Sequence, residues 1–391
     1  MRLLARLATA VLLTVTPIAA GSAATAAPEP TPAPLLTSMN AIPGQYVITL
    51  DKAASPARIA AALGVKAKFT YTSALHGFAA SLTADQLRTA RVTAGVKSVE
   101  EDANVSTPPT PVTLGGTRSP AGSWGLDRID QEGLPLDGNF RANGSGQGVT
   151  AYILDTGIEY GHTEFGGRAR LGFDAFGGDG SDCNGHGTRV AGTVGGETFG
   201  VARKVSLVSV RVLGCDGRGP WSGIIAGLDW VANHARQPAV LNASLGGDRF
   251  ASVNSATNAV YDHGVLPIIA AGNENRDACR VSPASANRAF TVGATNKFDE
   301  ETDFSNWGEC LEIYAPGKEI VSAKLHGGNV ALDGTSMAAP HVTGVAALYK
   351  AEHPSATPAE VQDFLEDKST KDVVENLSDN SPNRLLFTNA L

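Results

Sequence analysis

The sequence predicts an α/β protein, in which a three-layer domain around a mostly parallel sheet follows a small α+β domain. Three observations support this prediction. Short apolar runs recur after residue 123, helix-like segments separate them, and a segment rich in Pro, Thr, Gly and Ser at 106–122 divides them from a shorter region. Strands buried on both faces read as continuous apolar runs, and their alternation with helices is typical of a parallel sheet.

Composition agrees with a folded protein of two or three domains. The 391 residues are 42% hydrophobic and 18% charged, and the net charge of -8 comes without a long basic run. A basic patch is the electrostatic signature of nucleic-acid binding, and anionic membranes select for the same charge. Neither nucleic acid nor a membrane surface is therefore expected as the main partner, and we expect a monomer.

The chain begins with the pattern of a cleavable signal peptide, which we assign to residues 1–27. Arg2 and Arg6 precede an apolar run at 7–20, and small residues including the Ala-x-Ala-like Ala24-Thr25-Ala26 follow. A membrane anchor is the alternative, but the run is short and Pro17 interrupts it. We expect a secreted, extracellular protein with no membrane association once the signal is removed.

The first folded region is predicted at 45–105, between linkers at 28–44 and 106–122. Its strand–helix–strand–helix–strand order indicates a small α+β domain. The expected elements are a strand at 46–50, a helix at 56–63, a strand at 77–82, a helical stretch at 83–94 and a strand at 96–99. The second linker is exposed in character, and a maturation cut is expected between about 105 and 121.

The second folded region is predicted at 123–391. Its candidate strands lie at 149–154, 206–212, 240–241, 265–271 and 290–292, and its candidate helices lie at 222–234, 251–263 and 335–349. In open sheets of this kind, ligands and catalytic groups gather at the carboxyl ends of the strands. The motifs that follow these strands are therefore the candidates for function.

Four cysteines, Cys183, Cys215, Cys279 and Cys310, are an even number in an exported chain, where disulfides are favoured. Three pairings are possible. Nearly equal separations of 32 and 31 residues suggest Cys183–Cys215 and Cys279–Cys310. Each such loop would stabilise the fold by about 3–4 kcal/mol on a chain-entropy argument. The spacings are too wide for a CxxC metal site, and buried free thiols are the other alternative.

Three polar motifs supply the groups that acyl transfer needs. Asp155 ends the apolar strand in Ile153-Leu154-Asp155-Thr156-Gly157, His186 lies between glycines, and Ser336 lies where a loop enters a long helix. A serine hydroxyl needs an imidazole to remove its proton, and a carboxylate must orient that imidazole. Asn273 follows a fourth apolar strand, and its amide could donate to the oxyanion together with the helix N-terminus.

These motifs, Asp-Thr-Gly, His-Gly-Thr and Gly-Thr-Ser-Met-Ala-x-Pro-His in that order, resemble the subtilase family of serine proteases. The segments at 124–130, 182–188 and 381–386 resemble its proteinase K subgroup, especially aqualysin-like enzymes. Residues 45–105 are similar to the family's inhibitor-type propeptide. The resemblance implies a subtilisin-like fold and an endopeptidase made as an autoprocessed zymogen, whose own propeptide assists folding and inhibits the enzyme.

The resemblance also implies how protein and peptide substrates bind, as an added strand between two glycine-rich edges. The residues concerned are Gly217, Gly219, Trp221, Ser244, Leu245, Gly246, Ala271 and Gly272. Glycines allow another backbone to approach closely. The resemblance implies that Ala270, Ala271 and Gly272 help form the pocket before the scissile bond, and they carry no charge, so we predict broad specificity with an apolar or aromatic preference there. Trp221 would line a further upstream pocket, or simply be a packed aromatic.

Calcium is the one cofactor expected, in a structural role, and catalysis needs none. The first candidate site is a loop dense in oxygen donors, which match a calcium site of aqualysin-like relatives: Asp127, Asp130, Gln131, Asp137 and Asn139. A solvated acidic turn is the alternative. The resemblance places a second site at Asn287, Ala289 and Glu312, where the relatives carry Asp in place of Glu312.

Two other functions share part of this sequence pattern. An aspartic protease would share Asp155-Thr156-Gly157 but needs a second such motif, and Asp333-Gly334-Thr335 has the wrong order. A catalytically silent, subtilase-like scaffold that binds peptides is the remaining alternative, and the presence of all three candidate catalytic residues counts against it.

Overall fold

The computed structural model describes residue 10 and residues 31–107, 112–113, 122–389 and 391. Nearly all of the predicted signal peptide and most of the predicted linker at 106–122 lie outside these residues. Within the described residues, no helix combines the length and the apolar character that crossing a membrane requires.

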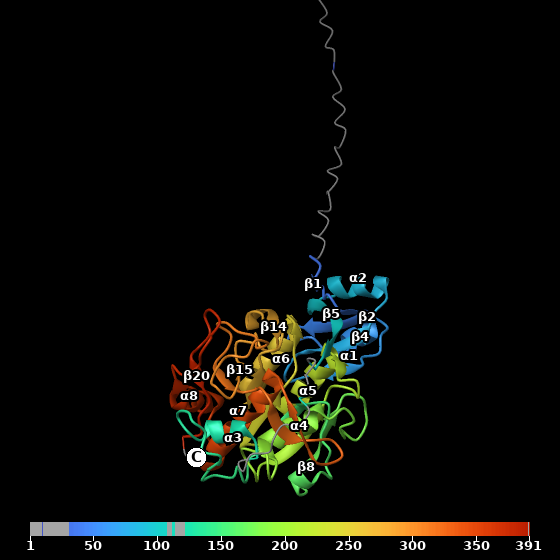
Figure 1. Cartoon of the computed structure of the whole chain (residues 1–391). Helices are drawn as coiled ribbons and strands as arrows, with labels where there is room; N and C mark the ends of the chain where they lie inside the picture. Colours follow the sequence, from blue (N-terminus) through green and yellow to red (C-terminus); the bar gives the residue numbers. More distant parts are fainter. Residues whose placement is uncertain (1–9, 11–30, 108–111, 114–121, 390) are drawn as a thin grey trace, which may run out of the picture. The chain divides into compact units, whose positions relative to one another are not determined.

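The first domain is a small sheet with two helices, grouped together in Figure 1. Its strand order is β1-β5-β2-β4-β3, and the central strand β2 pairs antiparallel with both β4 and β5. The elements are β1 (Leu35–Leu36), β2 (Ala41–Leu50), α1 (Pro56–Ala62), β3 (Phe69–Tyr71), β4 (Gly77–Ser81), α2 (Ala84–Val92) and β5 (Val96–Ser106).

Local sequence explains where the two helices of this domain begin. Ser55 caps α1 by accepting a hydrogen bond from Arg58 N, and proline follows at the first helical position. Thr83 and Gln86 form a reciprocal capping box at the start of α2. A core that includes Ile48, Phe78 and Val99 lies between helices and sheet.

The structure extends the first domain beyond its predicted start. β1 and the beginning of β2 fall inside the predicted linker 28–44, because Leu35 and Leu36 pair in parallel with β5. β5 is also longer than the predicted strand at 96–99 and continues to Ser106. Residues predicted as connecting segments are therefore held in strands by backbone hydrogen bonds, which the local sequence pattern does not predict.

The second domain is built on a long sheet. Among the described residues its order is β19-β20-β16-β15-β13-β11-β7-β9-β8, and every neighbouring pair from β20 to β8 is parallel. The strands are β7 (Thr150–Asp155), β8 (Ala169–Asp174), β9 (Ser206–Arg211), β11 (Ala239–Ala243), β13 (Leu266–Ala270), β15 (Phe290–Thr295), β16 (Ile313–Pro316), β19 (Thr370–Lys371) and β20 (Arg384–Leu385).

Helices cover both faces of this sheet (Figure 1). Alternate residues of β7 enter different cores: Ile153 packs with the helices α4 (His186–Gly195), α7 (Thr335–Glu352) and α8 (Pro358–Lys368), whereas Leu154 packs with α5 (Trp221–His234) and α6 (Ala251–Asp262). Successive side chains of a strand point to opposite faces, so an uninterrupted apolar run is what a doubly covered strand requires. The predicted three-layer fold is confirmed.

Shorter elements complete the described chain. They are β6 (Val112–Thr113), α3 (Trp124–Ile129), η1 (Thr163–Phe165), β10 (Arg218–Pro220), β12 (Gly247–Asp248), η2 (Ala278–Arg280), β14 (Val281–Ser282), β17 (Ile320–Ala323) and β18 (Asn329–Leu332). One of them matters for the site. β10 pairs antiparallel with the end of β5, so the first domain contributes a strand to the second.

Candidate active site

The four predicted catalytic residues all follow a strand end or begin a helix of the second domain. Asp155 is the last residue of β7, and His186 is the first residue of α4. Ser336 is the second residue of α7, and Asn273 follows shortly after β13. The placement agrees with the rule that parallel sheets collect their functional groups at the carboxyl edge.

Asp155 and His186 form a direct hydrogen-bonded pair. The Nδ1–H of His186 donates to both carboxylate oxygens of Asp155, at 2.8 and 2.9 Å. Asp155 is fully buried and His186 is 2% exposed. Because the carboxylate can only accept, the contact fixes the tautomer that leaves Nε2 without a proton. That nitrogen is buried and has no hydrogen-bond partner among the described residues.

Ser336 is buried beside Ser244 rather than hydrogen-bonded to the histidine. Its Oγ donates to the carbonyl of Ser244 at 3.2 Å, and Ser244 Oγ donates in return to the carbonyl of Ser336 at 3.1 Å. The described contacts therefore bring Asp155 to His186 and Ser336 to Ser244. They do not include a hydrogen bond between His186 and Ser336.

Asn273 is oriented by a residue that sequence reasoning missed. Its Oδ1 accepts from the backbone N–H of Thr335 at 2.9 Å and from the Thr335 hydroxyl at 2.8 Å. Thr335 Oγ1 accepts in turn from Gly272 N at 3.0 Å. With its oxygen occupied, the amide of Asn273 presents its NH₂ group as the remaining donor. Thr335 stands directly before Ser336, and only that adjacency could have pointed to it.

The two predicted substrate edges flank the chain's own strand β5. Arg218, Gly219 and Pro220 of β10 pair antiparallel with residues 104–106, and Ser106 also forms a bridge with Gly246. Beyond the strand, Thr107 N donates to the carbonyl of Gly217 at 2.9 Å. An extended segment therefore already lies between the segments at 217–220 and 244–246, as an added strand.

The remaining predicted substrate residues are packed in the interior. Leu245 and Ala271 are buried, and Trp221 is 2% exposed and packs against Phe250 at a centroid distance of 5.6 Å. Gly272 has φ of +105°, and a Cβ there would clash with the Asn306 amide. Glycine is needed at this position because both its backbone conformation and the space exclude other residues.

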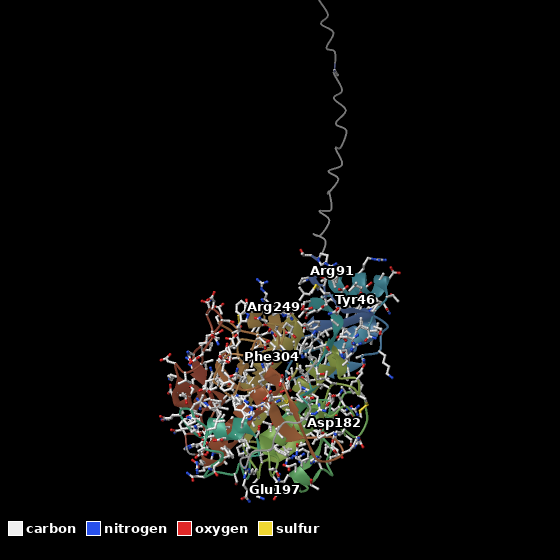
Figure 2. The ribbon with its side chains drawn as sticks, viewed as in Figure 1. Tyr46, Arg91, Asp182, Glu197, Arg249 and Phe304 are labelled. Atoms are coloured by element: carbon white, nitrogen blue, oxygen red, sulfur yellow. A yellow bond between two sulfur atoms is a disulfide. The ribbon has the colours of Figure 1, made fainter. Side chains whose placement is uncertain are left out.

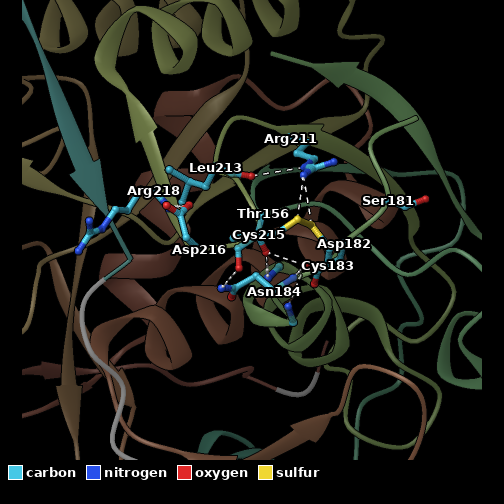
Figure 3. Close-up of a disulfide and its surroundings, with 12 residues drawn as sticks. Thr156, Ser181, Asp182, Cys183, Asn184, Arg211, Leu213, Cys215, Asp216 and Arg218 are labelled. Atoms are coloured by element: carbon cyan, nitrogen blue, oxygen red, sulfur yellow. Dashed lines mark hydrogen bonds between the residues drawn. A yellow bond between two sulfur atoms is a disulfide. The ribbon is translucent and has the colours of Figure 1, made fainter. Parts of the chain in front are cut away.

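Both disulfides occur in the pairing that the equal separations suggested. Cys183 is bonded to Cys215, and Cys279 is bonded to Cys310. Figure 3 shows the first bond between the loop that precedes His186 and the segment that leads to β10, with Asn184 Nδ2 donating to the carbonyl of Cys215 at 3.1 Å. This bond joins the histidine loop to the substrate edge.

The loop predicted to hold calcium gathers its donors around Asp127 and Asp130. Asp127 accepts from Asp137 N and Gly138 N at 3.2 and 2.8 Å, and burial raises its pKa. Asp130 Oδ2 accepts from Arg141 N at 2.6 Å, while its Oδ1 is buried without a hydrogen-bond partner among the described residues. An orphaned carboxylate oxygen of this kind fits a cation ligand.

Other members of this loop contact one another. Gln131 Oε1 accepts from Asp137 N at 3.3 Å, and Asp137 Oδ1 accepts from Asn139 N at 2.9 Å. Asp137 also pairs with Arg141. In the described part of the chain, no group of three or more His, Cys, Asp or Glu side chains is arranged to hold a metal ion.

The second candidate cation site is less well arranged. Glu312 accepts from Thr291 N, and burial raises the pKa of its carboxyl group to about 8. Ala289 is buried and Asn287 is exposed. At neutral pH such a carboxyl group is mostly protonated unless a cation compensates its charge. The donors of this second site therefore fit a cation poorly.

The first domain is held to the second by three carboxylates outside the predicted site. Glu100 accepts from Ala251 N and Ser252 N at the start of α6, at 2.8 and 2.9 Å, and Asp102 accepts from Ser222 N at the start of α5, at 3.1 Å. Asp229 of α5 binds the loop at 72–74. Helix N-termini favour such negative groups. Sequence could not assign these partners, which are about 100 residues or more apart in the chain.

Comparison with known proteins agrees with this geometry. The model of the subtilase family matches residues 146–386, and the model of peptidase inhibitor I9 matches residues 45–108. A solved structure described as a cold adapted subtilisin-like serine proteinase aligns with a TM-score of 0.67 and 49% identity, over 68% of this chain and 97% of that chain.

Two relatives illustrate the extent of the likeness. The alkaline serine exoprotease A of Vibrio alginolyticus is 44% identical over 333 residues, which are 85% of this chain and 62% of that protein. The extracellular serine proteinase of Thermus sp. (strain Rt41A) is 47% identical over 329 residues, 83% of this chain and 78% of that protein. This chain thus spans less than two thirds of the Vibrio relative.

The fold, the paired acid and histidine, and the buried serine at a helix start define a protein of the serine-hydrolase type. The chain belongs to the subtilase family, and it is a serine endopeptidase of that family made with an inhibitor I9 propeptide.

Proposed function

We propose that this subtilase is a secreted endopeptidase that acts through Asp155, His186 and Ser336 and is held inactive by its own N-terminal domain until it is processed. The observations that carry the proposal are the buried Asp155–His186 pair, at 2.8 Å, and the extended end of β5, which pairs with β10 at the predicted substrate edge. The name of the Thermus relative describes it as extracellular, and the same destination is proposed here.

Catalysis would begin with the neutral imidazole of His186, whose Nε2 is the free acceptor because Nδ1–H is held by Asp155. This nitrogen takes the proton of Ser336 as the hydroxyl attacks the scissile carbonyl, and later gives it to the leaving amine. Asp155 holds the imidazole and stabilises the imidazolium. For this to occur, Ser336 Oγ must exchange its hydrogen bond with the Ser244 carbonyl for one with His186.

The oxyanion would be stabilised by the Asn273 amide and by the backbone N–H groups at the start of α7. Thr335 supports this role because it occupies the amide oxygen and so aims the NH₂ group. Such preorganised donors act in a site where water has little access, which makes each of them worth more than in solution.

Substrates would bind where β5 binds, between the segments at 217–220 and 244–246. The pocket before the scissile bond would use Ala271 and Gly272, which carry no charge, so an apolar or aromatic residue is preferred there. Since most of the affinity comes from backbone hydrogen bonds, specificity is broad. A peptide library in which cleavage requires Arg or Lys at this position would overturn the proposal on specificity.

Calcium would be held by Asp130, Asp127 and their neighbours Gln131, Asp137 and Asn139, and a second set of donors would be Asn287, Ala289 and Glu312. The unpartnered oxygen of Asp130 supports the first site. When bound, the ion would cross-link the loop that follows α3 by neutralising its carboxylates. It takes no part in peptide hydrolysis, for which the triad suffices.

The test of the whole proposal compares the purified precursor with its Ser336→Ala variant. The precursor should lose its N-terminal domain, hydrolyse an apolar chromogenic peptide and react with a fluorophosphonate probe, whereas the variant should do none of these. If the two proteins behave alike and neither reacts with the probe, the triad does not work as a unit and the proposal fails.

A further inference from the structure

Asp182, labelled in Figure 2, lies in the loop before α4, and its carboxylate accepts five hydrogen bonds. Its Oδ1 accepts from Thr156 Oγ1, Asn184 N and Gly185 N at 2.9, 2.9 and 2.8 Å. Its Oδ2 accepts from Thr188 N and Thr188 Oγ1 at 2.9 and 2.7 Å. The side chain is 93% buried, at 7% exposure.

The donors come from the two segments that carry the catalytic pair. Thr156 directly follows Asp155, and its own N–H donates to Asp155 Oδ1 at 2.7 Å. Thr188 lies in the first turn of α4, two residues after His186. The Thr156 hydroxyl also accepts from Gly187 N at 2.9 Å, so one chain of hydrogen bonds runs from Asp182 through Thr156 to the helix that bears His186.

The start of α4 depends on this arrangement. Its N-cap is Gly185, with φ of +101°, and no side chain of the N-cap residue closes the helix. The first backbone N–H groups of a helix have no partner inside it. Here Thr156 takes that of Gly187 and Asp182 takes that of Thr188. Asp182 thus caps α4 from outside the usual N-cap position.

The charge of Asp182 is compensated by these dipoles and by one nearby cation. Among the described residues no salt bridge is formed to this carboxylate, but the guanidinium of Arg189, in α4, interacts with it electrostatically. Five hydrogen bonds from N–H and O–H groups and the positive end of α4 add to this compensation. An amide in its place could accept through one oxygen only, and the N–H groups on the other side would lose their partner.

We infer that Asp182 is a positioning residue for the catalytic pair: it holds Thr156 and the first turn of α4 together, so that His186 Nδ1 faces Asp155. The inference rests on the proposed function, since it gives Asp182 a role through His186 and Asp155. Figure 3 shows Asp182 and Thr156 beside the Cys183–Cys215 bond. That disulfide fixes the loop's other side, next to the substrate edge.

The test uses the mature enzyme with Asp182→Asn, which keeps the shape and removes the charge. A displacement of the imidazole by about 1 Å is enough to lower kcat roughly 100-fold, and we expect a decrease of about 10- to 100-fold with KM changed by less than about twofold. The proton resonance of His186 Nδ1–H reports the hydrogen bond to Asp155 and should shift or broaden relative to the wild type. Asp179→Asn is the matched control, because Asp179 is an exposed carboxylate in the same loop whose described hydrogen bonds come from Ser181 and not from the catalytic segments.

A second pair of variants decides the matter if Asp182→Asn does not fold or mature. Thr156→Val removes the bridging hydroxyl at constant shape and should lower kcat in the same way, while Thr156→Ser should restore it. If Asp182→Asn or Thr156→Val lowers only the melting temperature and leaves kcat and the resonance as in Asp179→Asn, the inference is wrong. If Ser336→Ala retains activity in the same assay, the proposed function itself fails.

Discussion

The carboxylate of Asp229 accepts a 2.7 Å hydrogen bond from the backbone N–H of Ser73, 156 residues earlier in the chain. The same oxygen also accepts from Thr72 N and Ala74 N, at 3.0 and 2.8 Å. Asp229 lies in α5 of the second domain, and the loop at 72–74 belongs to the first. This contact, with those of Glu100 and Asp102, keeps the N-terminal domain on the enzyme.

Asp229→Asn should shorten the time for which the cleaved N-terminal domain inhibits the enzyme. Charged hydrogen bonds of this kind contribute about 1.5–3 kcal/mol, so the affinity should fall by about 10- to 100-fold. The measurement is the lag before peptide hydrolysis begins after processing of the precursor. Asp367→Asn, at an exposed carboxylate in α8, is the control and should leave the lag unchanged. Equal lags in all three proteins would show that Asp229 does not anchor the domain.

Thr335→Val should lower kcat because Asn273 loses one of the two contacts that aim its amide, whereas Thr335→Ser should keep them. Asn273→Ala should have the larger effect, since loss of the equivalent donor in subtilisin, a member of the same family, costs roughly 10²–10³ in kcat. Single-turnover hydrolysis of a chromogenic peptide measures both. An unchanged kcat in Asn273→Ala would exclude this residue from the oxyanion site.

Stability should fall as the pH drops from about 6.5 to about 4 because of His341 in α7. This residue is fully buried, its Nδ1–H donates to the Met337 carbonyl at 2.8 Å, and burial lowers its pKa from 6.5 to about 4. Above pH 6.5 the imidazole is neutral in both states. Below pH 6.5 the unfolded chain binds a proton at this imidazole, whereas the native state does not bind it until about pH 4. The free energy of unfolding therefore falls by up to about 3 kcal/mol.

Urea unfolding of the Ser336→Ala precursor at pH 7 and pH 4 measures this effect without autolysis. His341→Gln should reduce the difference between the two pH values, while His263→Gln, at an exposed histidine, should not. If the two variants lose the same stability between pH 7 and pH 4, His341 is not the group responsible.

Removal of calcium should lower the melting temperature by several degrees and change kcat little, because the candidate loop lies after α3 and away from the triad's own contacts. Asp130→Asn should abolish the response to added calcium, since it removes the unpartnered carboxylate oxygen. Melting curves with EDTA and with calcium, recorded for wild type, Asp130→Asn and Asp179→Asn, provide the test. Superimposable wild-type curves would argue against both proposed sites.

Much of this protein could be predicted from the sequence because its signals are local. The apolar run 149–154 corresponds to β7, and the helix-like stretch 335–349 forms most of α7. Asp155 lies at a strand end, and His186 and Ser336 lie at helix starts. Periodicity and turn residues are set by neighbours in the chain, so a sequence reader sees them directly.

What depends on distant neighbours could not be read in this way. Three features join residues that are distant in the sequence and close in the folded protein. They are the parallel pairing of Leu35–Leu36 with β5, the hydrogen bonds of Thr335 to Asn273, and the hydrogen bond of Thr156 to Asp182. The identity of a residue does not show which partner its backbone N–H or its carboxylate binds. The order of residues thus predicts the fold class and the candidate chemical groups. Which polar atoms meet depends on the packing of distant segments, because most buried polar groups must find a hydrogen-bond partner there.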